Sequence, residues 1–434
     1  MARIARRRVL GLSASGGLAA ILASGRGPAL AQETNVHWLR WTDFVPASDA
    51  LLKGKFTEDC KKATGITLKV ETVNANDLQP RITSAIQSGS GADIIMAYNN
   101  WPQLYAPSLV DAGDVVDEIG KAQGGFYDIS RQVATVGDKW IGVPWTTGGG
   151  LISWRKSWFQ EVGHDKFPED WDTFRDAGKK LKAQGRPIGQ TAGHTFGDAP
   201  GWWYPFLWSF GGKEVEADGK TVVLNSKETV ESIKFAVALW KDAMDEGGLA
   251  WDDTNNNRAF LSQTISATNN GASIYLEAKK KPDTYKTEKG TPLFQDIQHA
   301  AIPKGVAGQY VNPSTFTDML MGYSKNQKAA KEFLRWAHSQ PVFDEWFTSQ
   351  QGYSCGATKM WETHKVWDAD PVMKPFHDLP NKGRLVGFAG PPNRKAAEVV
   401  TKYIIVDMYA RAIQGMPAEA AAKWAHEEVA KTYA

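Results

Sequence analysis

The sequence predicts an α/β fold in which open sheets are covered on both faces by helices. Three segments, residues 35–41, 66–73 and 93–98, have the patterns of strands. Helical segments at 48–64 and 77–88 separate them, which gives a β-α-β-α-β order. That order is typical of an open, mainly parallel sheet in an α/β protein.

Each of these elements has a local signal. Residues 66–73 alternate apolar and polar side chains, as a half-buried strand does, whereas 93–98 is largely apolar, as a strand buried on both faces is. The helix at 48–64 is expected to end at Gly65, and the helix at 77–88 is interrupted early by Pro80.

The rest of the chain continues the pattern. A glycine-rich break at 144–150 lies between strand-like runs and suits a crossing between two lobes. No linker-like stretch occurs in the sequence, so the lobes are expected to interleave along the chain. Further helices are expected at 171–184, 226–246, 328–339, 342–349, 399–412 and 417–433.

Length and charge restrict the class of protein. The 434 residues suffice for two or three domains with large cores. Residues 1–31 hold five arginines and no acid, so the remainder has 45 basic and 48 acidic residues and a charge of −3. A slightly acidic body does not favour nucleic-acid binding. The 18 tryptophans indicate either generous core filling or flat platforms for a ligand with apolar faces.

Residues 1–31 are expected to be an export signal that is cleaved. Three consecutive arginines at 6–8 precede a weakly apolar stretch of small residues, and residues 29–31 form a small-x-small cleavage site. The arginines followed by an apolar pair resemble a twin-arginine signal. The sequence therefore predicts an exported protein that begins near Gln32.

Signatures of catalysis are sparse. Residues 153–156 have the S-x-x-K spacing but lack the S-D-N and K-T-G motifs that accompany it in enzymes. No HExxH, Walker A or dinucleotide fingerprint occurs, and no CxxC pair for a metal. A glycosidase pair of carboxylates stays open, because acids are plentiful. We expect a protein that is not an enzyme and holds no cofactor or metal.

A series of motifs along the chain resembles one family, the family 1 extracellular solute-binding proteins, which are the maltose-binding-like receptors of carbohydrate ABC importers. The resemblance covers essentially all of the chain after the signal. The motifs are LRWTDF (39–44), SGSGADIIMAYNNW (88–101), LVDAGD (109–114), KWIGVPW (139–145), GLISWRKSWFQEVG (150–163), FPEDWDTF (167–174), LWSFGGK (207–213), AAKEFLRW (329–336) and QGMPAEAAAKWAHEEV (414–429).

This resemblance implies two lobes, each an α/β sheet, joined by three crossings and closing around a ligand by hinge motion. The implied first lobe holds residues 32–144 and 272–313, and the implied second lobe holds 145–271 and 314–434. Cys60 and Cys355 would then lie in different lobes, and we expect two free thiols because a disulfide would staple the hinge.

The function implied is that of a periplasmic receptor. It would be a monomer that captures a neutral carbohydrate and delivers it to an inner-membrane ABC permease, without nucleic acid as a partner. The turns at 41–43, 99–101 and 145–147 contain no lysine or arginine, which favours a neutral ligand. Two alternatives stay open: an exported carbohydrate-active hydrolase, and the same receptor type specific for a polyol or phosphorylated polyol.

Polar turns after three predicted strands are the first candidates for the ligand site, since ligands of open α/β sheets bind at the carboxyl ends of the strands. Carboxylates, hydroxyls and amides can hydrogen-bond sugar hydroxyls, and an indole can lie against a sugar face. The alternative role for these residues is helix capping or turn formation. The candidates are Trp41, Thr42, Asp43, Asn99, Asn100, Trp101, Trp145 and Thr146.

The second lobe and the crossings supply the other candidates. In an extended loop at 193–203 one of two consecutive indoles would face the cleft, and the alternative is that both pack beneath the loop. Family position suggests ligand contacts for two residues at crossings, and the alternative for these is a hinge role without ligand contact. Family position also suggests one arginine, for which a surface position is favoured. These candidates are His194, Asp198, Trp202, Trp203, Asn270, Thr315 and Arg394.

Overall fold

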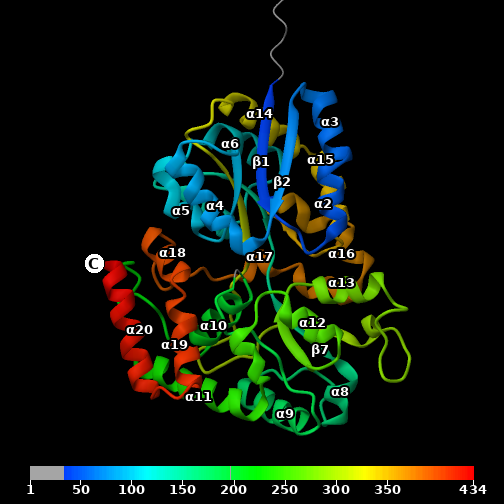
Figure 1. Ribbon diagram of the computed structural model, residues 1–434, viewed down its shortest axis with the longest axis vertical. Coiled ribbons are helices and arrows are strands. Elements are labelled where there is room, and N and C mark those ends of the chain that lie inside the picture. Colours follow the sequence, from blue (N-terminus) through cyan, green and yellow to red (C-terminus); the bar gives the residue numbers. More distant parts are fainter. Residues whose placement is uncertain (1–33, 196) are drawn as a thin grey trace, which may run out of the picture.

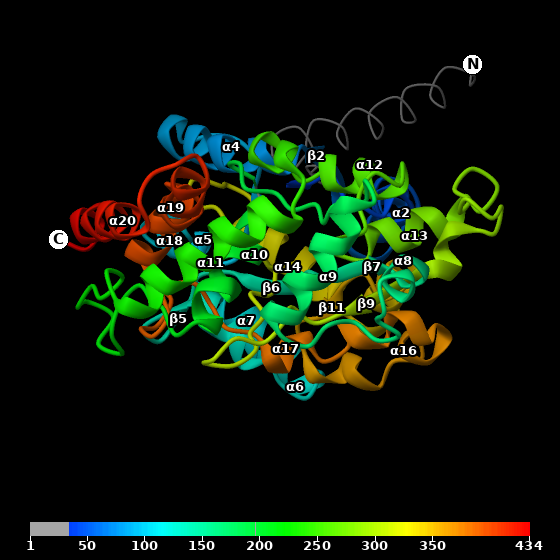
Figure 2. The same ribbon diagram turned by 90° about the horizontal axis from the view of Figure 1, so that it is seen from below.

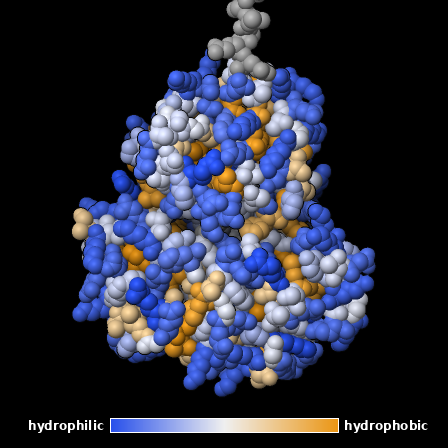
Figure 3. Space-filling model, in the orientation of Figure 1, coloured by the Kyte–Doolittle hydropathy of each residue, from blue (hydrophilic) through white to orange (hydrophobic). Residues whose placement is uncertain are grey.

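The computed structural model describes residues 34–195 and 197–434, which form two lobes, one above the other in Figure 1. The expected two-lobed α/β fold is confirmed. The expected export signal at 1–31 lies outside the described residues. Figure 3 shows that hydrophilic residues cover most of this face of both lobes and that the upper lobe is narrower than the lower one.

The upper lobe contains a six-stranded sheet in the order β11-β6-β10-β3-β1-β2. β1 pairs in parallel with β2 and β3, as the β-α-β-α-β pattern predicts, whereas β10 pairs antiparallel with β3 and β6. β1 runs toward the junction of the lobes, so its carboxyl end lies there (Figure 1). The strands are β1 (Asn35–Trp41), β2 (Thr67–Val73), β3 (Ile94–Tyr98), β6 (Val143–Thr147), β10 (Thr315–Leu320) and β11 (Cys355–Gly356).

Helices cover this sheet, and one expected helix is divided. The segment predicted as a single helix at 48–64 is two helices that meet at Gly54, although the predicted end at left-handed Gly65 is confirmed. The helices of this lobe are α2 (Pro46–Lys53), α3 (Lys55–Thr64), α4 (Ala75–Ser88), α5 (Trp101–Tyr105), α6 (Gly113–Ala122), α7 (Asp128–Ala134), α14 (Gln327–Ala337), α15 (Gln340–Ser349), α16 (Val366–Ala369) and α17 (Leu379–Lys382). A small hairpin joins β4 (Thr135–Val136) to β5 (Lys139–Trp140).

The lower lobe contains a three-stranded antiparallel sheet in the order β8-β7-β9. Its strands are β7 (Leu151–Arg155), β8 (Ala267–Asn270) and β9 (Ile297–Ala300). Seen from below, α19 and α20 lie at one end of this lobe and α13 at the other (Figure 2). Its helices are α8 (Lys156–Glu161), α9 (Trp171–Ala183), α10 (Asp198–Ser209), α11 (Lys227–Ala243), α12 (Asn255–Leu261), α13 (Ser273–Lys280), α19 (Ile404–Ile413) and α20 (Ala418–Tyr433).

The C-terminal helix expected at 399–412 is also divided. It forms α18 (Arg394–Thr401) and α19, which are separated at Tyr403. Tyr403 has a φ of 54°, a left-handed conformation that an uninterrupted helix does not contain. α18 contacts α5 of the upper lobe, while its Val399 and Val400 pack in the core of the lower lobe, so α18 lies at the junction of the two lobes.

The strand pairing corrects the predicted lobe boundaries. β9 lies in the range assigned to the first lobe but pairs with β7 of the lower sheet, and β10 lies in the range assigned to the second lobe but pairs with β3 of the upper sheet. The polar break at 269–271 looked like a crossing but is the end of β8, where the chain turns within its own lobe. In the described residues the chain crosses near 148–150, between β9 and β10, and after α17.

The expectation of two free thiols is confirmed, but its reason is wrong. Cys60 on α3 and Cys355 on β11 are both buried and both belong to the core of the upper lobe. The Cys355 thiol donates to the Phe376 carbonyl at 3.2 Å, and the Cys60 sulfur lies 3.6 Å from the Thr64 hydroxyl. The thiols therefore remain apart within one lobe, and hinge motion is not what separates them.

Candidate functional site

A narrow cavity lies between the lobes, beside the crossings. Its volume is about 60 Å³, far below the several hundred Å³ of a typical small-molecule site. The two lobes nearly touch around it: a Cβ at Gly271 would lie 3.0 Å from the Tyr353 ring, so a larger residue would require the ring to shift. The cavity is lined by Trp41, Phe44, Gly148, Gly149, Gly150, Gly197, Asp198, Gly201, Asp253, Asn269, Asn270, Gly271, Asn312, Ser314, Phe316, Tyr353 and Ser354.

Two carboxylates stand at the first turn of α10. Asp253 accepts hydrogen bonds from the backbone N–H groups of Gly197 at 3.0 Å and Asp198 at 2.9 Å, and thereby caps the helix. The Asn256 carboxamide donates to Asp198 at 2.6 Å. Burial raises the pKa of both carboxyls, and the charge of Asp253 raises the pKa of Asp198 further.

Amide side chains form another part of the lining. Asn270 donates to the Asn257 carboxamide oxygen at 2.6 Å and so is held in place. Asn269 and Asn312 are 1% and 3% exposed, yet the carboxamide oxygen of the first and both polar atoms of the second have no hydrogen-bond partner. Buried polar groups are nearly always paired, so these atoms can accept or donate hydrogen bonds to a molecule that enters the cavity.

Aromatic side chains complete the lining. The Trp41 indole stacks on Phe316 with 4.9 Å between ring centroids. The Tyr98 hydroxyl lies 3.1 Å from that of Ser314, beside the crossing. Burial raises the pKa of Tyr353 well above its ordinary value, and the nearby Asp43, Asp198 and Asp253 raise it further. Both tyrosines therefore keep their protons and can donate hydrogen bonds.

The structure brings together only some of the residues expected from the sequence. Trp41, Asp198 and Asn270 line the cavity. Asn99 lies close by, where its side-chain oxygen accepts from the Thr315 N–H at 3.0 Å and so joins β3 to β10. Asn100 is fully buried with both carboxamide atoms unpartnered, but it does not line the cavity, and its ligand contact stays a prediction.

Other expected residues have structural roles. Asp43 accepts from the Val45 N–H and from Ser48 and Gln350, so the turn-forming alternative holds for it. Trp145 packs edge-on against Trp38 and Trp346 in the core of the upper lobe. Thr42 is exposed, Thr146 is buried within β6, and Trp101 packs against Tyr98.

The tryptophan pair corrects a further expectation. Residues 198–209 are a helix, α10, rather than an extended loop, and Trp202 and Trp203 are each 1% exposed in the core of the lower lobe. His194 instead stands at the surface, stacked on Tyr403 and 2.7 Å from Asp407. Arg394 is 65% exposed and pairs with Glu398, as the surface alternative predicts.

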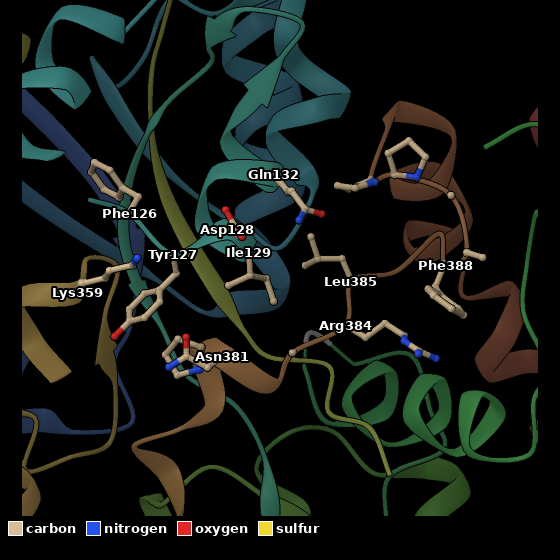
Figure 4. Close-up of a pocket in the computed structure, with 16 residues that line it drawn as sticks. Phe126, Tyr127, Asp128, Ile129, Gln132, Lys359, Asn381, Arg384, Leu385 and Phe388 are labelled. Atoms are coloured by element: carbon tan, nitrogen blue, oxygen red, sulfur yellow. The ribbon is translucent and has the colours of Figure 1, made fainter. Parts of the chain in front are cut away.

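A larger cavity, of about 570 Å³, lies across the crossings. Figure 4 shows Ile129 and Gln132 of α7 on one side of it and Leu385 on the other. Arg384 lies between the rings of Tyr310 and Phe388, 3.6 Å from each centroid. No lining side chain of the described residues has a buried polar atom without a partner, so the smaller interlobe cavity is the better candidate.

The fold and this interlobe cavity are those of a binding receptor with two lobes. The chain belongs to the bacterial extracellular solute-binding protein family, whose model matches residues 55–375. The proteins of this family and the structural neighbours described next are binding proteins, not enzymes. In the described residues no group of three or more acidic, histidine or cysteine side chains could hold a metal ion, and none of the helices has the length and apolarity to span a bilayer.

Several solved structures share this architecture, and a curated relative shares part of the sequence. Maltose-bound MalE3 of T. maritima has a TM-score of 0.76 and 19% identity, covering 91% of this chain and 99% of its own. A solute-binding protein of Thermotoga lettingae bound to α-D-tagatose has a TM-score of 0.77 and 18% identity, covering 92% and 100%. A ribitol complex from Agrobacterium radiobacter has a TM-score of 0.72 and 18% identity, covering 92% and 98%. A protein of Deinococcus radiodurans named "Probable ABC transporter-binding protein" is 23% identical over 65% of this chain and 69% of its own.

Several lining residues were missed by the sequence analysis. Asp253, Asn312 and Tyr353 come from three segments far apart in the chain. Asn312 precedes Pro313 at a crossing, and a polar residue before a proline at such a break is a signal that was available. Asp253 had no comparable signal, because adjacent acids at 252–253 also suit an ordinary solvated turn.

Proposed function

We propose that this protein is the substrate-binding protein of an ABC importer and captures a carbohydrate or polyol in the cavity between its lobes. The observation that carries the proposal is the pair of buried, incompletely bonded carboxamides, Asn269 and Asn312, beside carboxylates and an indole face. Amides and carboxylates suit hydroxyl groups, and an indole suits a sugar face. A membrane permease would receive the ligand.

A phosphorylated ligand fits this cavity poorly. Phosphate is usually bound by arginine, lysine or backbone N–H groups, and no lysine, arginine or histidine lines the cavity among the described residues. The N–H groups of Gly197 and Asp198 at the start of α10 are already taken by Asp253. A polyol remains a second candidate, since a ribitol complex shares the fold.

Ligand entry requires the lobes to move apart. A cavity of about 60 Å³ is far smaller than the several hundred Å³ of a typical small-molecule site. The structure therefore corresponds to a nearly closed arrangement, and hinge opening at the crossings would admit a sugar.

A screen of monosaccharides, disaccharides and polyols tests the proposal. Thermal unfolding should shift upward for a ligand, because binding at 100 times the Kd adds about 2.7 kcal/mol of stability. Calorimetry should then show one site per chain and chromatography no product. Product formation would support the hydrolase instead, and a panel with no binder would contradict the proposal.

Asn312→Ala is expected to weaken that binding by about 1–3 kcal/mol, a factor of roughly five to a hundred in Kd, because the ligand loses its hydrogen bonds to the amide. The unfolding midpoint should stay near that of the wild type, since the carboxamide has no partner within the protein. Asn326→Ala provides a control on the far side of the upper lobe, where the amide contacts Asp93. Equal ligand affinity in wild type and Asn312→Ala would remove Asn312 from the site.

We also propose export to the periplasm through the twin-arginine signal at residues 6–8, in keeping with the extracellular family. Replacing Arg6, Arg7 and Arg8 by lysine should retain the protein in the cytoplasm, as cell fractionation would show. Normal export of this variant would exclude the twin-arginine route, although not secretion by another one.

A further inference from the structure

The acidic groups of the interlobe cavity have no basic partner. Asp198 and Asp253 both line it, and no lysine, arginine or histidine does so among the described residues. Asp198 accepts from Asn256 through Oδ2, whereas its Oδ1 accepts no hydrogen bond from the described residues. One carboxylate oxygen at the cavity is thus available to a ligand.

The surrounding charges make this site more negative still. The charged groups that act on Asp198 are Asp253 and Asp252, both acidic, and burial adds to their effect by raising the pKa of Asp198. Two close, desolvated carboxylates repel each other, and a neutral ligand leaves that repulsion in place. A ligand with positive charge would relieve it.

Two further observations favour a polar ligand that carries a positive charge in the interlobe cavity. The carboxamide of Asn312, 3% exposed and without a partner, lines the same cavity and can accept as well as donate. The aromatic residues Trp41 and Tyr353 also line it. Aromatic faces attract cations, so the apolar part of the lining does not oppose a positive charge.

We propose that the ligand is a carbohydrate or polyol that carries a protonated amino group, bound by Asp198 with the support of Asp253. This inference rests on the proposed function and replaces the expectation of a neutral ligand. The ammonium donates to Asp198 Oδ1, while the hydroxyl groups pair with the amides of the lining. An ammonium–carboxylate hydrogen bond is roughly twice as strong as a neutral one, so the amino group would dominate selection.

Matched sugars that differ at one position test the proposal. Glucose, glucosamine and N-acetylglucosamine differ only at C2, and the same holds for the galactose and mannose series and for cellobiose against the disaccharide of glucosamine. Calorimetry at pH 7 should show the amine of at least one series binding tenfold or more tightly than both its hydroxyl and acetamido counterparts.

Asp198→Asn should abolish that preference, reducing the ratio of the two affinities to near one. Asp283→Asn is the matched control, because Asp283 is an exposed acid of the same lobe that pairs with Lys286 and does not line the cavity. The control should keep the preference, and thermal unfolding confirms that each variant is folded.

The number of protons released on ligand binding is a further measurement, and it would not change if Asp198 had a purely structural role. The amine should release protons from the carboxyls on binding, so its binding enthalpy should vary with the ionisation enthalpy of the buffer, whereas that of the hydroxyl form should not. If the hydroxyl form binds as tightly as the amine in every series, this inference is overturned and the proposed function stands. If no sugar or polyol binds in either form, both fail.

Discussion

Replacing Trp203 by alanine is expected to lower the free energy of unfolding by about 3–5 kcal/mol, the range typical of a large aromatic removed from a core. The indole is 1% exposed and stacks on Tyr409, with 4.5 Å between ring centroids, and on Trp240. These contacts join α10 to α11 and α19, so truncation opens a cavity where three helices meet. Urea denaturation followed by circular dichroism measures the loss.

Trp424→Ala is the matched control. Its indole is half-buried on α20, beneath the Arg411 guanidinium, and its removal should cost only about 1 kcal/mol. Folded Trp203→Ala protein should still bind the ligand, because Trp203 does not line the interlobe cavity. Unchanged stability together with lost binding would instead place this indole in the cleft.

The first part of the fold was predictable because local signals and tertiary packing agree there. Residues 94–98 are all buried as a strand between β1 and β10, and Gly65 ends α3 in the left-handed conformation that glycine tolerates. The antiparallel addition of β10 and β11 to this sheet has no local signal, because residues 315–320 lie more than 200 positions from β3.

The error at Trp202 and Trp203 has a specific physical origin. Glycine and proline at 197–201 are typical of a loop, but Pro200 lies in the first turn of α10, where a missing N–H costs no helical hydrogen bond. Once the segment is helical, all of its residues from Ala199 to Ser209 except Gly201 are buried, since helices enclose it on several sides. Two adjacent indoles can then share one core.

The candidate site was only partly predictable because its members come together across the hinge. Trp41 could be found from the end of a strand, and Asp198 from the glycine-rich segment at 193–203. The Asp253 carboxylate accepts hydrogen bonds from two backbone N–H groups at the start of α10, and the two segments lie some 55 residues apart in the chain. Asn312 is distinguished by the absence of partners for its carboxamide, which only a packed structure can show.

Glu214→Gln is expected to stabilise the protein at alkaline pH and to change little at pH 5. Glu214 is fully buried, accepts from the Gly387 N–H at 2.6 Å through Oε2, and has no partner at Oε1. Burial raises the pKa of this carboxyl from 4.5 to about 8. Glutamine keeps an oxygen that accepts from the Gly387 N–H but carries no ionisable group. The variant therefore retains the hydrogen bond and no longer titrates at this position.

The sign follows from the direction of the shift. A carboxyl whose pKa is higher in the folded protein contributes stability below pH 4.5, and this contribution is lost as pH rises through about 8. The free energy of unfolding of the variant should therefore exceed that of the wild type by an amount that grows to on the order of 3 kcal/mol at high pH.

Burial also raises the pKa of Asp318 to about 7, but Asp318 is present in both proteins and its effect cancels in the difference. Glu216→Gln, at a half-exposed acid paired with Lys213, is the control and should show no difference beyond about 0.5 kcal/mol. Urea denaturation from pH 5 to pH 9 measures both, and parallel curves for wild type and Glu214→Gln would show that this carboxyl is not neutral in the folded protein.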